Sequence, residues 1–317
     1  MAKLIMTVEE MKDREAWLKL RDSGLGGSDA ATIMGANPWK SALELWMEKT
    51  GQKKPEDLSG NQRVYWGQKN EGNIADWFVE TTGKQVRRRG MMQSCDHPWM
   101  LASVDREVVG ESAGLEIKTA GVNQARQWGV NDQGVLDEIP DMYYLQIQWY
   151  LAVTGWEYWY VAVLIGGNEA LWGRVERNEE QIAELVKAGE QFWKQVQDLI
   201  PPLPDGSESA KKALNKLYPG GRLEALQLQG PELIIAYERM KHFEAAEKEA
   251  KTAKEQYKQQ IEKAMGNYEV AYIGEDKVTW KTQAGRTTID GKGLKKDYPA
   301  IYEKYKKIGN PIRVFKA

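Results

Sequence analysis

Two carboxylates and a lysine lie close together in this 317-residue chain, in a pattern that could hold a metal ion. Asp105 stands eleven positions before Glu116, and Lys118 follows Glu116 after one residue. Carboxylate oxygens are hard ligands that suit Mg²⁺ or Mn²⁺, with substrate phosphate supplying further ligands. The residue types therefore suggest metal-assisted phosphate chemistry, although a Glu-x-Lys triplet alone also fits an amphipathic surface hairpin.

These residues need a strand pair to bring them together. Residues 101–109 have strand character, residues 110–114 form a plausible turn, and a second strand follows. Because strand side chains alternate between faces, Leu115 and Ile117 are expected to face a core, while Glu116 and Lys118 share the opposite face. The pattern predicts an antiparallel hairpin on which Asp105 and the Glu-x-Lys pair converge.

Two predicted helices carry further polar candidates. Residues 68–80 are expected to form a helix that presents Glu71, and residues 142–153 a helix followed by a strand over 156–165. Gln146 and Tyr150 are four residues apart, so they lie on one helical face and could both point into a cleft. Taken separately, they also fit a surface glutamine and a packing tyrosine.

The order Glu71, Asp105, Glu116-x-Lys118, Gln146-x-x-x-Tyr150 resembles the PD-(D/E)xK nuclease superfamily. Within it, the chain is most similar to the lambda-type alkaline exonucleases and the YqaJ-like viral recombinases. Trp66-Gly67 with Glu71 is similar to their Trp-Gly-x-x-x-Glu motif, and Asp105 fills the place of the Asp motif, with Val104 where the superfamily usually has proline. The resemblance covers about residues 14–200.

The resemblance extends to a terminal-phosphate pocket near the N-terminus. In the family an arginine and a serine seven residues apart hold a 5′-phosphate, and Arg21 and Ser28 have this spacing, with Trp17 one turn before Arg21. A guanidinium fork matches phosphate oxygens, and a serine at a helix start would be near free N–H groups. Ser28 would also serve as an ordinary helix cap after the Gly26-Gly27 turn.

The resemblance implies a role for each candidate. Asp105, Glu116 and the backbone carbonyl of Ile117 would bind Mg²⁺, for which Mn²⁺ would substitute, and Glu71 would help through water. Lys118 would orient or deprotonate the attacking water or offset phosphate charge; the sequence does not choose between these. The remaining implied catalytic residues are Gln146 and its supporting Tyr150. The activity implied is 5′→3′ exonucleolysis of linear double-stranded DNA, leaving 3′ overhangs for phage-type recombination, with a single-strand annealing recombinase as partner and a homotrimeric ring as assembly.

Composition bounds the class of protein. The net charge of −2 argues against a generic polyanion binder, although residues 277–317 carry eleven Lys and Arg against three Asp and Glu. No apolar run is long enough for a membrane span, so no membrane association is expected. A single cysteine, Cys95, allows no internal disulfide, and a charged N-terminus excludes a secretory leader. A cytoplasmic protein is expected.

The chain is expected to be α/β, with a restriction-endonuclease-like core of mixed β-sheet flanked by helices. This core is assigned to residues 1–200 and closes with a helix over 179–199. A proline-rich start marks residues 201–230 as a linker. Residues 231–317 are expected to form a helical arm over 231–265 and a small α+β extension with a basic hairpin region, its strands at 268–273 and 277–282.

Two other classes of function remain open at this point. One is a related nuclease, either a restriction-type endonuclease or a RecB-like strand nuclease, and an intact closed circle would argue against the endonuclease. The other is a non-catalytic module that binds DNA ends through Arg21, Ser28 and the basic tail. Unpaired carboxylates would repel phosphate in a mere binder, which favours the catalytic interpretation.

Overall fold

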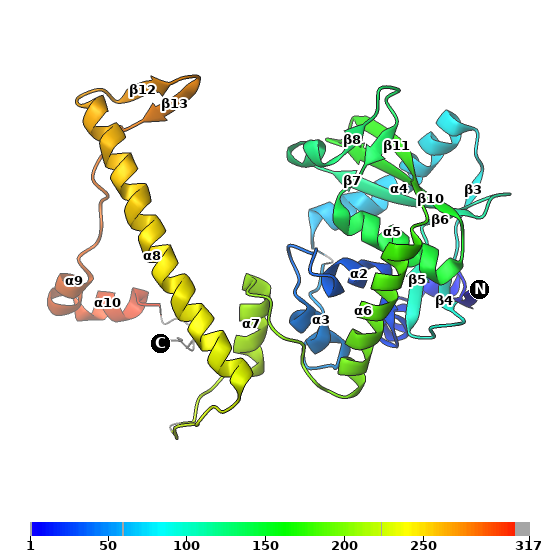
Figure 1. The fold of residues 1–317 in the computed structure, drawn as a ribbon, viewed down its shortest axis with the longest axis horizontal. Coiled ribbons are helices and arrows are strands. Elements are labelled where there is room, and N and C mark those ends of the chain that lie inside the picture. The colour runs from blue at the N-terminus through cyan, green and yellow to red at the C-terminus, as the bar shows by residue number, and fades with distance from the viewer. Residues whose placement is uncertain (1, 59, 223, 308–317) are drawn as a thin grey trace. The chain divides into compact units, whose positions relative to one another are not determined.

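A seven-stranded mixed sheet organises residues 1–219, one of two units into which the computed structural model divides; residues 220–317 form the other (Figure 1). The structure describes residues 2–58, 60–222 and 224–307. The sheet has the order β3 (Val86–Arg87), β6 (Arg106–Val108), β7 (Ala113–Ala120), β10 (Tyr158–Ile165), β11 (Glu169–Glu176), β9 (Leu136–Glu138) and β8 (Gly129–Val130). A second sheet has the order β1 (Ala2–Met6), β4 (Met91–Ser94), β5 (Met100–Ser103) and β2 (Leu25–Gly26).

Strand β7 is an interior strand that is paired along its whole length. It runs parallel to β10, with Glu116 opposite Val161 and Lys118 opposite Val163. On its other edge it pairs antiparallel with β6, where Arg106 lies opposite Leu115. The predicted hairpin is therefore present, and the register of its Glu-x-Lys segment is fixed by β10.

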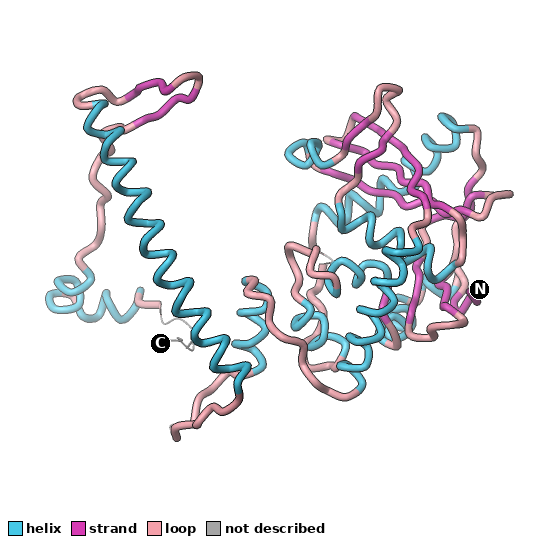
Figure 2. Tube along the Cα trace, in the orientation of Figure 1, coloured by secondary structure: helices cyan, strands magenta, loops and turns pink. Residues whose placement is uncertain are grey.

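The strand expected over residues 101–109 is two strands in two different sheets, so this prediction is wrong. β5 pairs with β4 and β2 in the four-stranded sheet, whereas β6 pairs with β3 and β7 in the seven-stranded sheet. The chain crosses between the sheets at Val104 and Asp105. Figure 2 shows the strands of the structure in magenta and the loops that join them in pink. An alternating apolar pattern looks the same in one strand as in two consecutive strands, which explains why the break was not visible.

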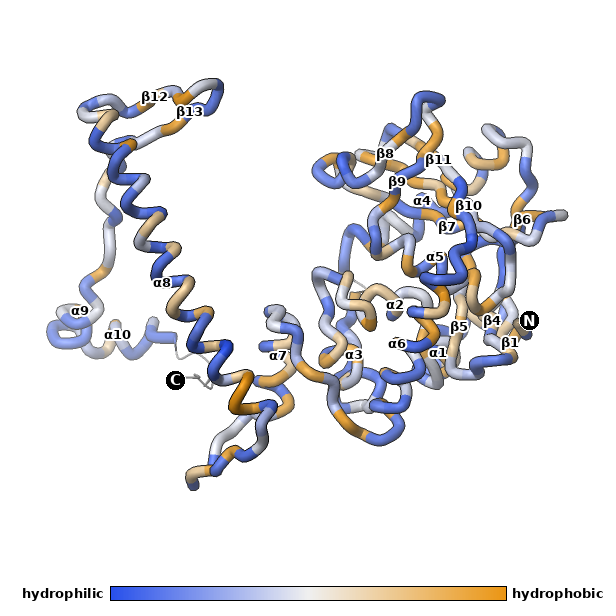
Figure 3. The backbone as a smooth tube through the Cα atoms, viewed as in Figure 1, coloured by the Kyte–Doolittle hydropathy of each residue, from blue (hydrophilic) through white to orange (hydrophobic). Residues whose placement is uncertain are grey.

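Helices cover both faces of the seven-stranded sheet. On one face α4 (Gln62–Thr82) buries Ile74 and Phe78 against Leu115 and Ile117 of β7. The other face packs against α5 (Asp141–Thr154), whose buried residues include Ile147 and Trp149. β10 alternates accordingly: Tyr160 and Ala162 face α4, and Trp159, Val161 and Val163 belong to the α5 side. Hydrophobic residues are concentrated along β10 in Figure 3. The predicted α/β fold, a mixed sheet flanked by helices, is confirmed.

The caps of these helices follow from local sequence. α4 begins six residues before the expected position because Asn61 accepts hydrogen bonds from the backbone of Arg63 and Val64. It ends at Gly83, which has a φ of 71°, a left-handed conformation that favours glycine. α5 ends in the same way at Gly155. α6 (Glu179–Gln197) is capped by Asn178, whose side chain accepts a hydrogen bond from the backbone of Gln181, and its apolar side joins the larger core.

Three short helices near the N-terminus complete this part of the unit. They are α1 (Arg14–Asp22), α2 (Gly27–Ile33) and α3 (Ala42–Lys49), and 3₁₀ segments lie at Glu10–Lys12 and Val122–Gln127. α2 packs closely on α5: a Cβ at Gly27 would overlap the ring of Tyr150. Glycine is thus required for this close approach.

Residues 201–230, expected to be a linker, contain a helix, α7 (Glu208–Leu217), and the two units divide between Pro219 and Gly220. The second unit contains α8 (Pro231–Met265), with the bounds that the sequence predicted. Its other described elements are β12 (Val270–Ile273), β13 (Asp276–Thr279), α9 (Gly291–Asp297) and α10 (Pro299–Tyr305). Most of α8 is exposed, and the end of the basic segment, residues 308–317, lies outside the described residues. No helix in the described part of the chain is long and apolar enough to cross a membrane.

Packing of β7 against β10 leads to a prediction about Gly114. A Cβ there would overlap the indole of Trp159, which is fully buried and stacked on Trp156 at 5.2 Å between ring centroids. Gly114→Ala should therefore lower the free energy of unfolding by about 1–3 kcal/mol, as overpacking does. Gly72→Ala is the matched control, since open space surrounds this helical glycine, and it should stabilise α4 by about 0.5–1 kcal/mol. Denaturant unfolding checks both; equal stability of the two variants would contradict the packing described here.

Candidate active site

A cavity of about 470 Å³ brings together every residue to which the family resemblance gave a catalytic, metal-binding or phosphate-binding role. It lies where β7, the β5–β6 junction, α4, α5 and the α1–α2 region meet. Its lining includes Trp17, Arg21, Ser28, Glu71, Asp105, Glu116, Ile117, Lys118, Gln146 and Tyr150. Residues more than a hundred positions apart in the chain therefore contribute to one surface.

Glu116 is the most deeply buried charged group of the cavity, with 2% of its surface exposed. Its Oε1 accepts a hydrogen bond from Gln146 Nε2 at 2.7 Å and a short one from Lys118 Nζ. Its Oε2 is buried and has no hydrogen-bond partner. A buried carboxylate oxygen without a partner is costly, so this oxygen is suited to binding a cation or a hydrogen-bond donor.

Asp105 faces the same place from the junction between the two sheets. Its Oδ2 accepts a hydrogen bond from the backbone N–H of Ile117 at 3.0 Å, which fixes the carboxyl against β7. Burial, together with the nearby Glu116 carboxylate, raises the pKa of Asp105 to about 8. Without a cation, the pair therefore resists carrying two negative charges near neutral pH.

Lys118 and the polar face of α5 form one hydrogen-bonded network with Glu116. Burial alone would lower the pKa of Lys118, but the carboxylates of Glu116 and Asp105 together raise it above its ordinary value. Lys118 Nζ lies 3.3 Å from Gln146 Oε1 and 4.7 Å from the centroid of the Tyr143 ring. Gln146 Nε2 also donates to the hydroxyl of Tyr150 at 2.9 Å. Burial is the main cause that raises the pKa of Tyr150, and the charge of the Glu116 carboxylate is the second, so the Tyr150 hydroxyl stays protonated.

Glu71 lines the same cavity and is engaged by a residue that the sequence analysis missed. Its Oε1 lies 2.5 Å from Nη1 of Arg106, which also donates to the backbone carbonyl of Asp105 at 2.7 Å. Arg106 is 6% exposed. The signal in the sequence was a charged residue between Val104 and Val108, at a position where alternation predicts an apolar side chain.

The carboxylate pair fits a hard divalent cation. Among the described residues, no group of three or more His, Cys, Asp or Glu side chains could hold a metal by itself. Mg²⁺ commonly uses only one or two carboxylates and completes its ligands with water and substrate phosphate. The partnerless Oε2 of Glu116 and the raised pKa of Asp105 are what two carboxylates placed for such a cation would show in its absence.

The other end of the cavity is cationic. Arg21 Nη2 makes a short hydrogen bond with Ser28 Oγ, and the guanidinium lies 5.4 Å from the ring of Trp17. The buried Nε1 of Trp17 has no hydrogen-bond partner. Ser103, which the sequence analysis did not single out, also lines the cavity. One cavity thus has an acidic pair at one side and an exposed arginine–serine pair at another.

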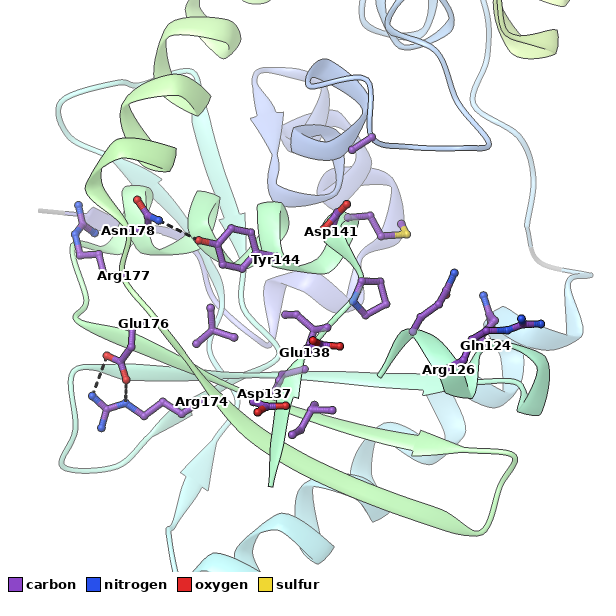
Figure 4. Close-up of a pocket in the computed structure, with 18 of the residues that line it drawn as sticks. Gln124, Arg126, Asp137, Glu138, Asp141, Tyr144, Arg174, Glu176, Arg177 and Asn178 are labelled. Carbon is purple, nitrogen blue, oxygen red and sulfur yellow. Dashed lines mark hydrogen bonds and ion pairs between the residues drawn. The ribbon is translucent and has the colours of Figure 1, made fainter. Parts of the chain in front are cut away.

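A second cavity, of about 1080 Å³, is larger but chemically less specific (Figure 4). Its Arg174 is paired with Glu176 at 2.6 Å, and Asn178 donates to the hydroxyl of Tyr144 at 3.3 Å. Its carboxylates Asp137, Glu138 and Asp141 are exposed. None of the described residues that line it has a buried polar atom without a partner. The smaller cavity is therefore the candidate active site.

Comparison with known proteins agrees with the residue pattern. Residues 16–157 match the model of the YqaJ-like viral recombinase domain. The chain is 37% identical over 302 residues, 93% of this chain and 91% of the relative, to the uncharacterized protein YqaJ of Bacillus subtilis (strain 168).

Solved structures of exonucleases are also similar in part. An alkaline exonuclease (LHK-Exo) from Laribacter hongkongensis matches with 20% identity and a TM-score of 0.47, covering 64% of this chain and all of that one. A phage-related exonuclease from Haemophilus somnus 129PT matches with 13% identity and a TM-score of 0.38, covering 56% and 96% of the two chains. The extent of the match to the Bacillus protein, together with the domain match, establishes that this chain belongs to the YqaJ-like viral recombinase family.

Proposed function

We propose that the chain is a metal-dependent 5′→3′ exonuclease that degrades one strand of linear double-stranded DNA and leaves 3′ overhangs for recombination. Membership of the YqaJ-like viral recombinase family supports a nuclease that acts on DNA in recombination. The observation that carries the finer proposal is the meeting of the Asp105–Glu116 pair and the Arg21–Ser28 pair around one cavity. A phosphodiester would be cut at the acidic end while a terminal phosphate is held at the cationic end.

The proposed chemistry assigns one task to each side chain. Asp105, Glu116 and the carbonyl of Ile117 would hold Mg²⁺ or Mn²⁺, which would act as a Lewis acid on the scissile phosphate and make a nearby water more acidic. Lys118, a cation held by Glu116 and Gln146, would offset charge that develops on the phosphate. Gln146 would orient the water or the adjacent strand and is itself positioned by Tyr150. Glu71, anchored by Arg106, would assist through water.

Two further elements of the proposal come from family resemblance alone. We propose a homo-oligomer, with a trimeric ring as the first candidate, and a single-strand annealing protein as partner for the 3′ overhang. A ring needs a basic lining rather than a basic exterior, which is compatible with the net charge of −2. Light scattering of the purified chain would decide the oligomeric state; a monomer at all concentrations would remove the ring.

Lys118→Ala tests the catalytic assignment. Cleavage of linear duplex DNA should fall by at least about 10²-fold, as when one transition-state donor is removed, while binding of DNA ends persists. Lys194→Ala is the control, because this lysine is 74% exposed on α6 and forms its ion pair with Asp198, outside the cavity. Turnover by Lys118→Ala equal to that of the control would sink the assignment.

End-labelled DNA tests direction and end dependence. Linear duplex with a 5′-phosphate should release nucleotides from that end faster than duplex with a 5′-hydroxyl, and a closed circle should remain intact. Arg21→Ala should reduce the difference between the two ends. Nicking of the circle would instead indicate an endonuclease, and tight end binding with no cleavage in Mg²⁺ or Mn²⁺ would indicate a binding module.

Asp105 gives a prediction about pH. In the unfolded chain its pKa is about 3.9, and in the fold it is about 8. The unfolded state therefore loses this proton first, so this group makes the metal-free protein less stable as pH rises from about 4 to 8. Asp105→Asn should remove this dependence and raise the metal-free Tm at pH 8 by at least about 3 °C, the shift expected for about 1 kcal/mol in a domain of this size.

Cation binding should show the complementary trend. Mg²⁺ competes with the Asp105 proton, so its affinity should rise with pH up to about 8, by at most about tenfold per pH unit. Scanning calorimetry after EDTA treatment, with and without added Mg²⁺, measures both effects. A wild-type Tm that is flat over this pH range, with no response to Mg²⁺, would contradict the proposed ligand pair.

A further inference from the structure

A buried lysine outside the proposed chemistry adjoins the arginine–serine pair. Lys49 is the last residue of α3, and its side chain is only 4% exposed. Its Nζ donates to the backbone carbonyls of Arg21 at 3.0 Å and Gly24 at 2.8 Å. Lysines that bind the last carbonyls of a helix fix its end, so Lys49 holds the end of α1 from which the Arg21 side chain extends.

The same ammonium group is paired with a buried carboxylate. Asp29 Oδ2 lies 3.3 Å from Lys49 Nζ and accepts a hydrogen bond from the N–H of Gly26 at 3.0 Å. Burial would raise the pKa of Asp29, but the charges of Lys49 and, next, of Arg21 hold it below its ordinary value. Asp29 is therefore ionised between two cations.

Arg21 is the second of these cations, and it is shared. Its Nη2 lies 4.0 Å from Asp29 Oδ1, beyond hydrogen-bond distance, while it bonds to the exposed Ser28 hydroxyl. Removing Lys49 would leave Asp29 with Arg21 as its one remaining ion-pair partner among the described residues. A buried carboxylate that loses its partner is strongly destabilised, so the guanidinium would be drawn toward Asp29 and away from Ser28.

We propose that Lys49 is a positioning residue for recognition of a terminal 5′-phosphate: by pairing with Asp29, it leaves the guanidinium of Arg21 free to bind the phosphate beside Ser28. This inference rests on the proposed function, because it assumes that Arg21 receives a phosphate. Asp29 has the opposite effect to Lys49. Its carboxylate competes with the phosphate for Arg21 unless Lys49 neutralises it.

Binding of short duplexes by the full chain tests this role. All variants are made in the Lys118→Ala background, so that cleavage does not interfere, and each is titrated with ends that carry 5′-phosphate or 5′-hydroxyl. Lys49→Gln should lower the preference for phosphate by about tenfold or more, the effect of one charge-assisted hydrogen bond, and leave binding of the hydroxyl end unchanged. Lys53→Gln, which breaks a separate ion pair with Glu44 and Glu48, is the control and should keep the preference.

The double variant distinguishes charge balance from simple support of the fold. Asp29→Asn with Lys49→Gln removes both charges, so Arg21 is no longer attracted inward and the preference for phosphate should return. Asp29→Asn alone should also keep it. In the cleavage-competent protein, Lys49→Gln should raise KM for phosphorylated ends and leave kcat at saturation unchanged.

Three results would overturn the proposal: full phosphate preference in Lys49→Gln, an equal loss of binding at both kinds of end, or no recovery in the double variant. Absence of any phosphate preference in the parent protein would overturn it as well. Failure of the nuclease proposal would give a different result. The wild-type chain would then not cleave DNA, while the variants would still show the expected changes in preference for 5′-phosphate ends.

Discussion

Placing two carboxylates side by side in the interior is the constraint on which the middle of this protein depends. Glu116 and Asp105 approach each other only because β7 is paired on both edges and because the Ile117 N–H holds Asp105. Their charge is balanced by Lys118 and supported by Gln146. The proximity still has a cost, since one buried oxygen of Glu116 has no partner and the pKa of Asp105 is raised.

The surrounding groups limit the electrostatic repulsion between these buried carboxylates. Arg106 neutralises Glu71 and binds the carbonyl of Asp105, so the third acidic side chain does not add to the repulsion without compensation. On the cationic side, Lys49 and Asp29 neutralise each other. The carboxylates that Lys118 balances only in part are therefore grouped where a metal ion would bind, and Arg21, which Asp29 approaches only to 4.0 Å, carries the positive charge beside Ser28. Under the proposed function, this charge separation would place a cation both at the phosphodiester to be cut and at the terminal phosphate.

Much of this arrangement could be predicted from the sequence because it depends on short-range periodicity. The alternation around Glu116 predicted which side chains of β7 face the core, and the four-residue spacing of Gln146 and Tyr150 predicted a shared face on α5. The break between β5 and β6 could not be predicted, because sheet membership depends on partners distant in sequence. Lys49 and Asp29 were missed for the same reason: a lysine at the end of one helix and an aspartate in another show no common pattern until the fold brings them together.

The crossing of the chain between two sheets at Asp105 has a mechanical consequence. One carboxylate of the pair belongs to the seven-stranded sheet through β7, whereas the other lies at the covalent joint between that sheet and the four-stranded one. The distance between the two acidic groups thus depends on how the two sheets are placed relative to each other. A packing change in the β1–β4 ladder that shifts the four-stranded sheet would therefore move Asp105 relative to Glu116, even though only Met91 of that ladder lines the cavity.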